Sequence, residues 1–160
     1  MAVKHDPTSL LQYSLDIATS NIDVAGGPFG AVIVRPNGVI VGYGGNSVTK
    51  LNDPSAHAEV MAIRNACSNI NDYDLSDCIL YSSCEPCPMC LGAIYWARIK
   101  EVIFAGNRVD AENAGFIDKF IYDEFDRKQE DRHMKCHKME ISNPIQPFQY
   151  WAAFINKKEY

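Results

Sequence analysis

Residues 84–90 of the chain read CEPCPMC, and residues 57–59 read HAE. In the first stretch two thiols, Cys87 and Cys90, are separated by two residues, and a tight turn with that spacing lets both sulfurs reach one metal ion. The amides at a helix N-terminus favour the thiolate, which is the form of cysteine that binds metal. His57 supplies a third ligand from a second predicted helix. Three protein ligands leave one position of a tetrahedral zinc ion open, as in catalytic sites.

The acidic residue next to the histidine has a different predicted role. Glu59 lies two residues from His57, so on a helix it points in another direction and need not bind the ion. Zinc lowers the pKa of a bound water toward ~7, and a neighbouring carboxylate can take the proton and pass it on. His-x-Glu followed by Pro-Cys-x-x-Cys is the signature of zinc deaminases that act on nucleobases. The sequence therefore predicts one Zn²⁺ per chain, with Glu59 as the proton carrier.

Other interpretations of the cysteines stay open on spacing alone. A single Cys-x-x-Cys pair is also found in redox sites and in structural zinc sites. Cys84 and Cys87 form a second pair with the same spacing, but Pro86 directly before Cys87 favours Cys87 and Cys90 as the ligands and Cys84 as the end of a strand. A non-catalytic zinc module that mediates assembly would need a fourth protein ligand, and Cys84 is the strongest candidate for it.

Hydrophobic periodicity predicts an α/β layered domain, because helical and strand-like segments alternate along the chain. A hairpin turn is expected at residues 36–38, which read PNG. The expected helices are 9–22, 56–67, 89–97, a segment from beyond Gly115 to Tyr122, and 148–157; the expected strands are 29–34, 39–43, 78–82, 101–105 and 136–141.

The composition limits the class of substrate. The chain has 160 residues, 47% hydrophobic and 22% charged, which suits a single soluble domain over 1–160. The formal net charge is −5 and no basic run is longer than Lys157-Lys158, so we expect a small-molecule substrate and no nucleic acid. No apolar stretch is long enough to span a bilayer, and the N-terminus lacks a signal-peptide pattern. We therefore expect a cytoplasmic protein with no membrane partner.

The motifs resemble the bacterial guanine deaminases of the cytidine-deaminase-like superfamily. The resemblance extends to GGPFGAVIV at residues 26–34, AGFID at 114–118 and NKKEY at 156–160, so it covers nearly the whole chain. The zinc motifs specify the superfamily, whereas Asp118 and the final Tyr160 point to the guanine branch. The resemblance implies a three-layer fold with a central five-stranded mixed sheet flanked by helices. It also implies a homodimer in which the C-terminal segments are exchanged between subunits.

The same resemblance implies hydrolytic deamination of guanine to xanthine and ammonia, a step of purine catabolism or salvage. Glu59 and Asp118 are the implied catalytic residues, since guanine presents donors at N1 and the 2-amino group that suit acceptor carboxylates. The implied substrate-binding residues are Phe29, Asn46, Ala58, Trp96 and Tyr160 of the partner subunit.

Some alternatives remain at this point. Composition alone favours Phe29 and Trp96 as core aromatics. The alternative for Asn46 is a turn residue in Gly44-Gly45-Asn46, and the alternative for Tyr160 is a frayed terminus. Guanosine, cytosine and tRNA adenosine deaminases share the zinc motifs, and the acidic net charge weighs against the tRNA enzyme.

Overall fold

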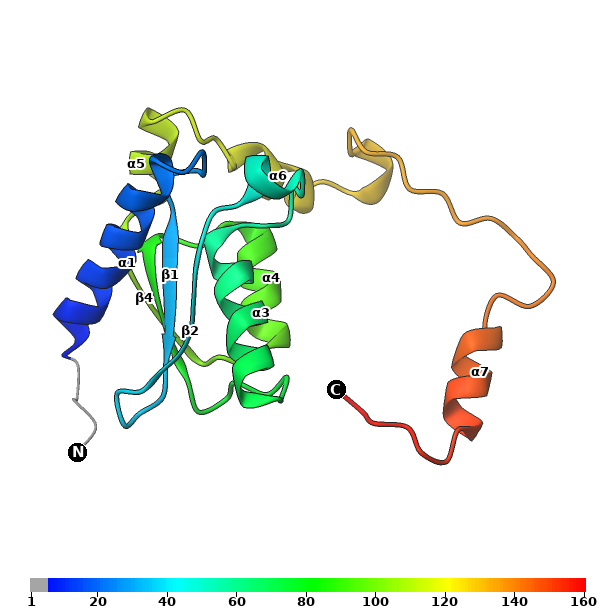
Figure 1. Cartoon of the computed structure of the whole chain (residues 1–160). Coiled ribbons are helices and arrows are strands. Elements are labelled where there is room, and N and C mark those ends of the chain that lie inside the picture. The colour runs from blue at the N-terminus through cyan, green and yellow to red at the C-terminus, as the bar shows by residue number, and fades with distance from the viewer. Residues whose placement is uncertain (1–5) are drawn as a thin grey trace. The chain divides into compact units, whose positions relative to one another are not determined.

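The computed structural model describes residues 6–160, and helices alternate with strands as the hydrophobic periodicity predicts (Figure 1). The chain divides into two compact units, Met1–Ile121 and Tyr122–Tyr160. The elements are α1 (Pro7–Ile22), β1 (Gly30–Val34), β2 (Ile40–Gly45), α2 (Val48–Leu51), α3 (Ala58–Ile70), β3 (Ile79–Cys84), α4 (Pro88–Trp96), β4 (Glu101–Gly106), α5 (Arg108–Asn113), α6 (Lys119–Asp126), a 3₁₀ turn at Gln129–Asp131, and α7 (Gln146–Ala153).

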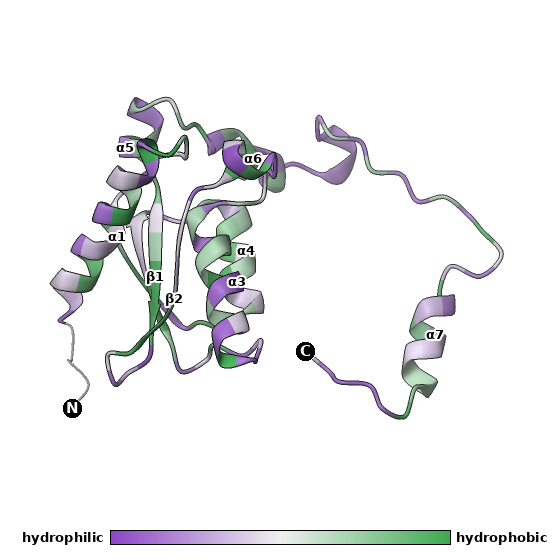
Figure 2. Ribbon diagram, in the orientation of Figure 1, coloured by the Kyte–Doolittle hydropathy of each residue, from purple (hydrophilic) through white to green (hydrophobic). Residues whose placement is uncertain are grey.

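The four strands form one mixed sheet in the order β2-β1-β3-β4. β1 runs antiparallel to β2 and to β3, whereas β3 and β4 are parallel. Every residue of β1 is buried, and its side chains alternate between two hydrophobic clusters: Ala31 and Ile33 join one, Val32 and Val34 the other. Figure 2 shows β1 to be hydrophobic along most of its length, and because both of its faces are apolar, each face needs a layer of helices to cover it.

Three layers result, as predicted. α1 packs on one face of the sheet against β1 and β3, and α3 packs on the other face against β2 and β1, with α4 beside it. A Cβ atom at Gly42 would lie 2.5 Å from the backbone nitrogen of Ala66, and one at Gly44 would lie 2.7 Å from Met61 Cβ. Glycine on β2 and a small residue such as Ala62 on α3 therefore let helix and strand touch closely, which fixes the helix that carries Glu59.

The sheet has four strands where the resemblance implies five. Residues 136–141, predicted as a strand, form no strand in the described chain. A strand needs a backbone partner, and Met139 and Ile141 of this segment are exposed side chains with no apolar layer beneath them. The last helix begins two residues earlier than predicted, because Pro147 fits the first helical turn, and it ends at Ala153 rather than Lys157.

The Tyr122–Tyr160 unit has no core of its own. Not one of residues 122–160 is buried, and α7 exposes large apolar side chains, among them Phe148 and Tyr150. A segment this short cannot bury enough apolar surface to be stable alone. Within residues 6–160, no helix combines the length and the apolar character that crossing a membrane requires.

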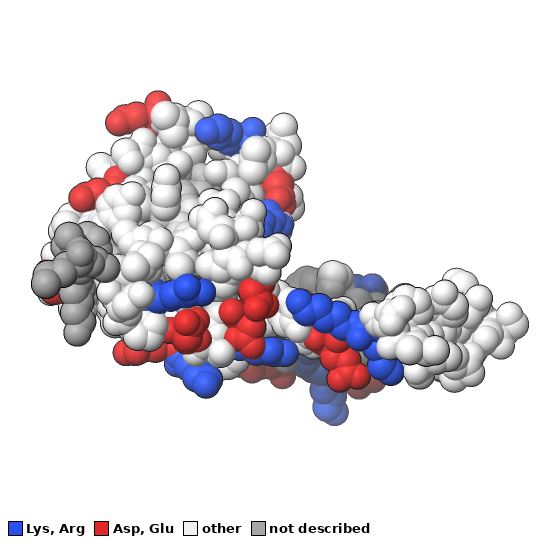
Figure 3. Space-filling view, turned by 60° about the horizontal axis from the view of Figure 1, so that its bottom comes forward, with Lys and Arg blue, Asp and Glu red and all other residues white. Residues whose placement is uncertain are grey.

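Surface charges are mixed in sign. On the face drawn in Figure 3, basic side chains alternate with acidic ones instead of gathering into one broad basic area. Several cations are paired within the Met1–Ile121 unit, as Arg64 is with Asp53 and Arg98 with Asp74.

Candidate metal centre and active site

The N-termini of α3 and α4 carry two of the predicted ligands. His57 is the N-cap of α3 and Cys87 is the N-cap of α4, and both have extended backbone conformations. An N-cap side chain usually accepts a hydrogen bond from the first turn of its helix, but neither His57 nor Cys87 does so. Their side chains are thus free for another partner. Pro88 occupies the first turn of α4, where its missing N–H costs nothing.

The three predicted ligand atoms lie together. His57 Nδ1 is 3.6 Å from Cys87 Sγ and 3.5 Å from Cys90 Sγ, and the two sulfurs are 3.5 Å apart. Tetrahedral zinc with its usual bond lengths separates an imidazole nitrogen from a thiolate by about 3.5 Å and two thiolates by about 3.8 Å. The three side chains therefore fit a zinc ion, with His57 and two cysteines as its protein ligands.

One sulfur of the pair is already prepared to bind metal. The contact between the Cys87 and Cys90 sulfurs, with help from His57, lowers the pKa of Cys87 to about 4. The same contact, together with burial, raises the pKa of Cys90. Cys87 is thus a thiolate at neutral pH, and a zinc ion would be held by both sulfurs as thiolates.

Cys84 lies outside this cluster. Among residues 6–160, the group of metal-ligating side chains that gathers within 4.8 Å consists of His57, Cys87 and Cys90. Cys84 ends strand β3, as predicted, and its thiol points to the carbonyl of Asn107 at 3.5 Å. Burial raises the pKa of Cys84 to about 11, so it is a thiol at neutral pH. The ligand set leaves one zinc position open to water.

Glu59 is buried beside the metal ligands. Its side chain is 6% exposed, and burial raises the pKa of its carboxyl group above the usual value. Glu59 Oε1 accepts a hydrogen bond from the Ser82 hydroxyl at 3.4 Å, and Oε2 accepts one from Cys90 Sγ at 3.3 Å. Glu59 is not part of the ligand group, as its position two residues after His57 predicts.

A cavity of about 360 Å³ opens over these residues, which is a size typical of small-molecule sites. It brings six predicted site residues together from five parts of the chain. Its lining consists of Phe29, Asn46, His57, Glu59, Cys84, Glu85, Cys87, Arg108, Ala111, Gly115, Phe116, Ile117, Asp118 and Ile121.

Phe29 and Asp118 both interact with neighbours in the lining of the cavity. The ring of Phe29 meets Phe116 edge to face, with centroids 4.9 Å apart, a favourable aromatic geometry. Asp118 lies just before α6, where burial first and the Cys87 thiolate second raise the pKa of its carboxyl group. A second carboxylate thus shares the cavity with Glu59.

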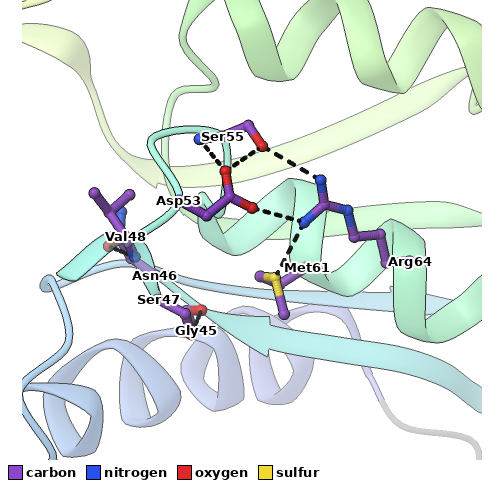
Figure 4. Close-up of polar contacts among 8 residues, drawn as sticks. All are labelled: Gly45, Asn46, Ser47, Val48, Asp53, Ser55, Met61 and Arg64. Carbon is purple, nitrogen blue, oxygen red and sulfur yellow. Dashed lines mark hydrogen bonds and ion pairs between the residues drawn. The ribbon is translucent and has the colours of Figure 1, made fainter. Parts of the chain in front are cut away.

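The loop from β2 to α3 is ordered by its own side chains (Figure 4). Asn46 is 8% exposed, and its Oδ1 accepts a hydrogen bond from the backbone nitrogen of Val48 at 3.3 Å. Asp53 accepts bonds from the backbone and the hydroxyl of Ser55, and Arg64 of α3 reaches Asp53 at 3.3 Å. These contacts hold the loop that leads into His57, and they leave the Asn46 amide nitrogen available as a donor.

The described chain does not bring every predicted residue to the cavity. Trp96, at the end of α4, is 71% exposed and is absent from the cavity lining. Ala58 is fully buried in the first turn of α3, and its side chain does not line the cavity either. Tyr160 belongs to the Tyr122–Tyr160 unit, where it is 75% exposed.

The sequence prediction missed two charged residues of the lining, Glu85 and Arg108. Glu85 Oε2 accepts a hydrogen bond from the backbone nitrogen of Arg108 at 3.1 Å, which ties the start of α5 to the segment before Cys87. A capping box between Asn107 and Asp110 begins this helix, and the Asn-x-x-Asp spacing is the signal by which α5 could have been predicted.

Comparison with known proteins agrees with this geometry. Residues 4–106 match the family described as the cytidine and deoxycytidylate deaminase zinc-binding region. The guanine deaminase of Bacillus subtilis (strain 168) is 52% identical over 95% of this chain and 97% of its own length. Its X-ray structure superposes with a TM-score of 0.94, over 98% of this chain and 99% of that one.

Two further relatives match less of the chain. The tRNA-specific adenosine deaminase of Haemophilus influenzae is 40% identical over 61% of this chain and 57% of its own length. A solved protein in complex with 8-azaguanine is 34% identical, with a TM-score of 0.69, over 72% of this chain and 67% of its own. With its three ligands at zinc-binding distances and a matching family model, the chain belongs to the cytidine and deoxycytidylate deaminase zinc-binding family.

Proposed function

We propose that this protein is a guanine deaminase, which hydrolyses guanine to xanthine and ammonia. The observation that carries the proposal is the cavity in which two carboxylates, Glu59 and Asp118, lie with His57 and Cys87 of the zinc site. In this reaction a bond forms between C2 of the purine and a water oxygen, and the bond from C2 to the exocyclic nitrogen breaks. When bound, zinc supplies a water of lowered pKa at this point.

Glu59 is the group that moves protons in this proposal. It takes a proton from the attacking water and delivers it to a ring nitrogen, and then takes the proton of the new C2 hydroxyl and delivers it to the departing amine. Its burial and its raised pKa support the role, because a carboxyl group with a raised pKa takes up a proton more readily than an exposed one does. The hydrogen bond from Ser82 orients one of its oxygens.

Asp118 supports the choice of guanine. Guanine presents N–H donors at N1 and at the 2-amino group, and a carboxylate at the cavity wall accepts from such donors. A site built around paired polar groups rejects an analogue that lacks them by several orders of magnitude. Asn46 can donate its amide to an acceptor of the base, and Phe29, braced by Phe116, offers an aromatic surface for the ring.

We also propose a homodimer in which the Tyr122–Tyr160 segment is exchanged and belongs functionally to the single domain. The support is physical: residues 122–160 contain no buried residue, yet α7 and the segment after it carry Trp151, Phe154 and Ile155. Exposed aromatics of this kind are stable in water only when another surface covers them. In such a dimer Tyr160 of the partner subunit closes the site, and exposed Trp96 has a second chain to pack against.

Other substrates of related enzymes are less well supported. A tRNA substrate requires a basic surface, whereas this chain carries a net charge of −5 with mixed signs on the face drawn in Figure 3. A structural zinc module requires a fourth protein ligand, and Cys84 instead bonds to Asn107. The match to guanine deaminase also extends through the segment that carries Asp118.

Ammonia release from a panel of substrates tests the proposal. The zinc-loaded protein is assayed with guanine, guanosine, cytosine, adenine and a tRNA stem-loop. We expect the highest kcat/KM on guanine, with adenine and cytosine far poorer. Equal or better turnover of guanosine or cytosine would overturn the guanine assignment while leaving a deaminase, and no ammonia from any member would overturn the enzyme assignment itself.

A further inference from the structure

Asn21, in the last turn of α1, makes two short hydrogen bonds to distant parts of the chain. Its Nδ2 donates to the carbonyl of Gly27 and to the carbonyl of Asn46, each at 2.7 Å. An amide nitrogen carries two hydrogens, so both donors of Asn21 are used. One side chain therefore links the end of α1, the loop before β1 and the residue after β2.

Backbone hydrogen bonds close this link into a ring. The nitrogen of Phe29 donates to the carbonyl of Gly27 at 2.8 Å, and the nitrogen of Asn46 donates to the carbonyl of Phe29 at 3.0 Å. Asn21, Gly27, Phe29 and Asn46 thus form a closed circuit of four hydrogen bonds. Phe29 and Asn46 line the cavity, whereas Asn21 does not. The circuit fixes the spacing between an aromatic and an amide that face the substrate.

Two glycines make room for the Asn21 amide. A Cβ atom at Gly26 would lie 2.1 Å from Asn21 Nδ2, and one at Gly45 would lie 2.7 Å from Asn21 Cγ. Neither glycine has a backbone φ in the left-handed region, so its conformation does not require glycine. Both positions lack a side chain because the amide of Asn21 occupies that space.

We propose that Asn21 is a positioning residue for purine binding, acting through Phe29 and Asn46 without touching the substrate. This inference rests on the proposed function, since it assumes that the cavity binds a purine. A carboxylate at position 21 keeps the shape of the side chain but has no hydrogen to donate, so the carbonyl oxygens of Gly27 and Asn46 lose the Asn21 donor and face a negative charge. Phe29 and Asn46 then move apart, and the base is bound less well.

The direct test is Asn21→Asp in the full-length, zinc-loaded protein. We expect KM for guanine to rise about tenfold, the equivalent of one or two lost hydrogen bonds, while kcat changes less than about threefold. Calorimetric binding of 8-azaguanine should weaken by a similar factor. Zinc content should not change, because the ligands lie on α3 and α4. An unchanged KM with unchanged affinity for 8-azaguanine would overturn the proposal.

Asn69→Asp is the matched control. Asn69 Nδ2 also donates to a distant carbonyl, that of Val41 in β2, at 2.8 Å, but neither residue lines the cavity. The chemical change is the same in both variants. The rise in KM of each variant is therefore compared together with its loss of thermal stability. A rise in KM for Asn69→Asp as large as that for Asn21→Asp would show a general structural effect and overturn the positioning role.

A double variant shows whether Asn21 acts through Asn46. If it does, the double variant Asn21→Asp/Asn46→Ala should have a KM less than about threefold above that of Asn46→Ala alone. A double variant whose rise in KM equals the product of the two single rises would overturn the route through Asn46.

If Asn21→Asp does not fold, Gly26→Ala displaces the amide without removing it and should raise KM in the same way. If the unmodified protein releases no ammonia from guanine, the proposed function fails, and the Asn21 variants are measured on the panel base with the highest turnover.

Discussion

The hydroxyl of Ser82 lies 3.4 Å from Glu59 Oε1 and donates a hydrogen bond to it. Ser82 is on β3 and 2% exposed, so this contact joins the centre of the sheet to the first turn of α3 inside the core. The bond restricts the rotation of a buried carboxyl group that has Cys90 on its other side. The sheet therefore takes part in orienting the proposed proton carrier.

Ser82→Ala should lower kcat on guanine about tenfold with little change in KM. The carboxyl group of Glu59 loses a donor that orients it, and misorientation of a proton carrier affects the chemical step more than binding. Steady-state kinetics check the result. Ser83→Ala is the control, because Ser83 Oγ accepts from the backbone nitrogen of Gly30 instead of contacting Glu59. Equal kcat values for the two variants would argue against an orienting role for Ser82.

Glu59→Gln should abolish turnover, with a loss of at least about a hundredfold, while about one zinc per chain is retained. The amide keeps the shape of the side chain but cannot accept and release a proton. Zinc analysis by mass spectrometry, together with the ammonia assay, provides the measurement. Cys87→Ala should instead lose the metal, because one of three protein ligands is missing. A zinc-free Glu59→Gln protein, or one that keeps most of its activity, contradicts the assigned role.

Asp118→Asn should reduce kcat/KM on guanine by about two orders of magnitude or more, again with zinc retained. The variant replaces an acceptor carboxylate by an amide that presents donors to the donors of guanine. Asp110→Asn changes the same chemical group in α5, where it weakens a capping box outside the cavity lining. Comparable losses in both variants would mean that Asp118 supports the local fold and does not contact the base.

The proposed exchange of C-terminal segments can be tested by mixing two inactive chains. Deletion of Glu159 and Tyr160 should leave a folded, zinc-loaded dimer with sharply reduced activity, because nothing shields the bound base from water. Deletion from Phe148 onward should also disturb dimerisation, which sedimentation would detect.

A mixed dimer of the Tyr160-deleted chain and a Glu59→Gln chain contains one site with an intact Glu59 and the partner's Tyr160. Activity should therefore return after co-refolding of the two chains. Verified mixed dimers without activity would show that Tyr160 closes the site of its own chain or of neither chain.

Stability should depend on Asp74 in a defined pH range. Hydrogen bonds from Ser76 first, and then from Arg98, lower the pKa of Asp74 to about 2. A carboxyl group with a lowered folded-state pKa stabilises the fold above its unfolded pKa of about 3.9, and this contribution is lost as pH falls from there through 2. Asp74→Asn should thus lower the urea midpoint at pH 7 and have little effect below pH 2. A constant difference across this range would exclude the linkage.

The sequence alone determined the zinc site and the layered α/β fold. Cys87 and Cys90 are three residues apart at the start of one helix, and His57 and Glu59 are two apart at the start of another, so local geometry already dictates how each pair points. The positions of β1 to β4 were predicted in the same way. In a strand such as β1, successive side chains point to opposite faces of the sheet, and this depends only on the two-residue repeat of the strand.

Tertiary structure decided which other residues reach the substrate cavity. Residue patterns alone do not distinguish Phe29 from Trp96, yet the described chain lines its cavity with Phe29 and leaves Trp96 exposed. The strand expected at residues 136–141 does not form, because pairing depends on whether a distant strand offers its edge. Asn21 carried no sequence signal at all: it is separated by 25 positions from Asn46, whose carbonyl it binds. Contacts between residues so far apart in the chain depend on how the layers pack, and a pattern of neighbouring residues does not contain that information.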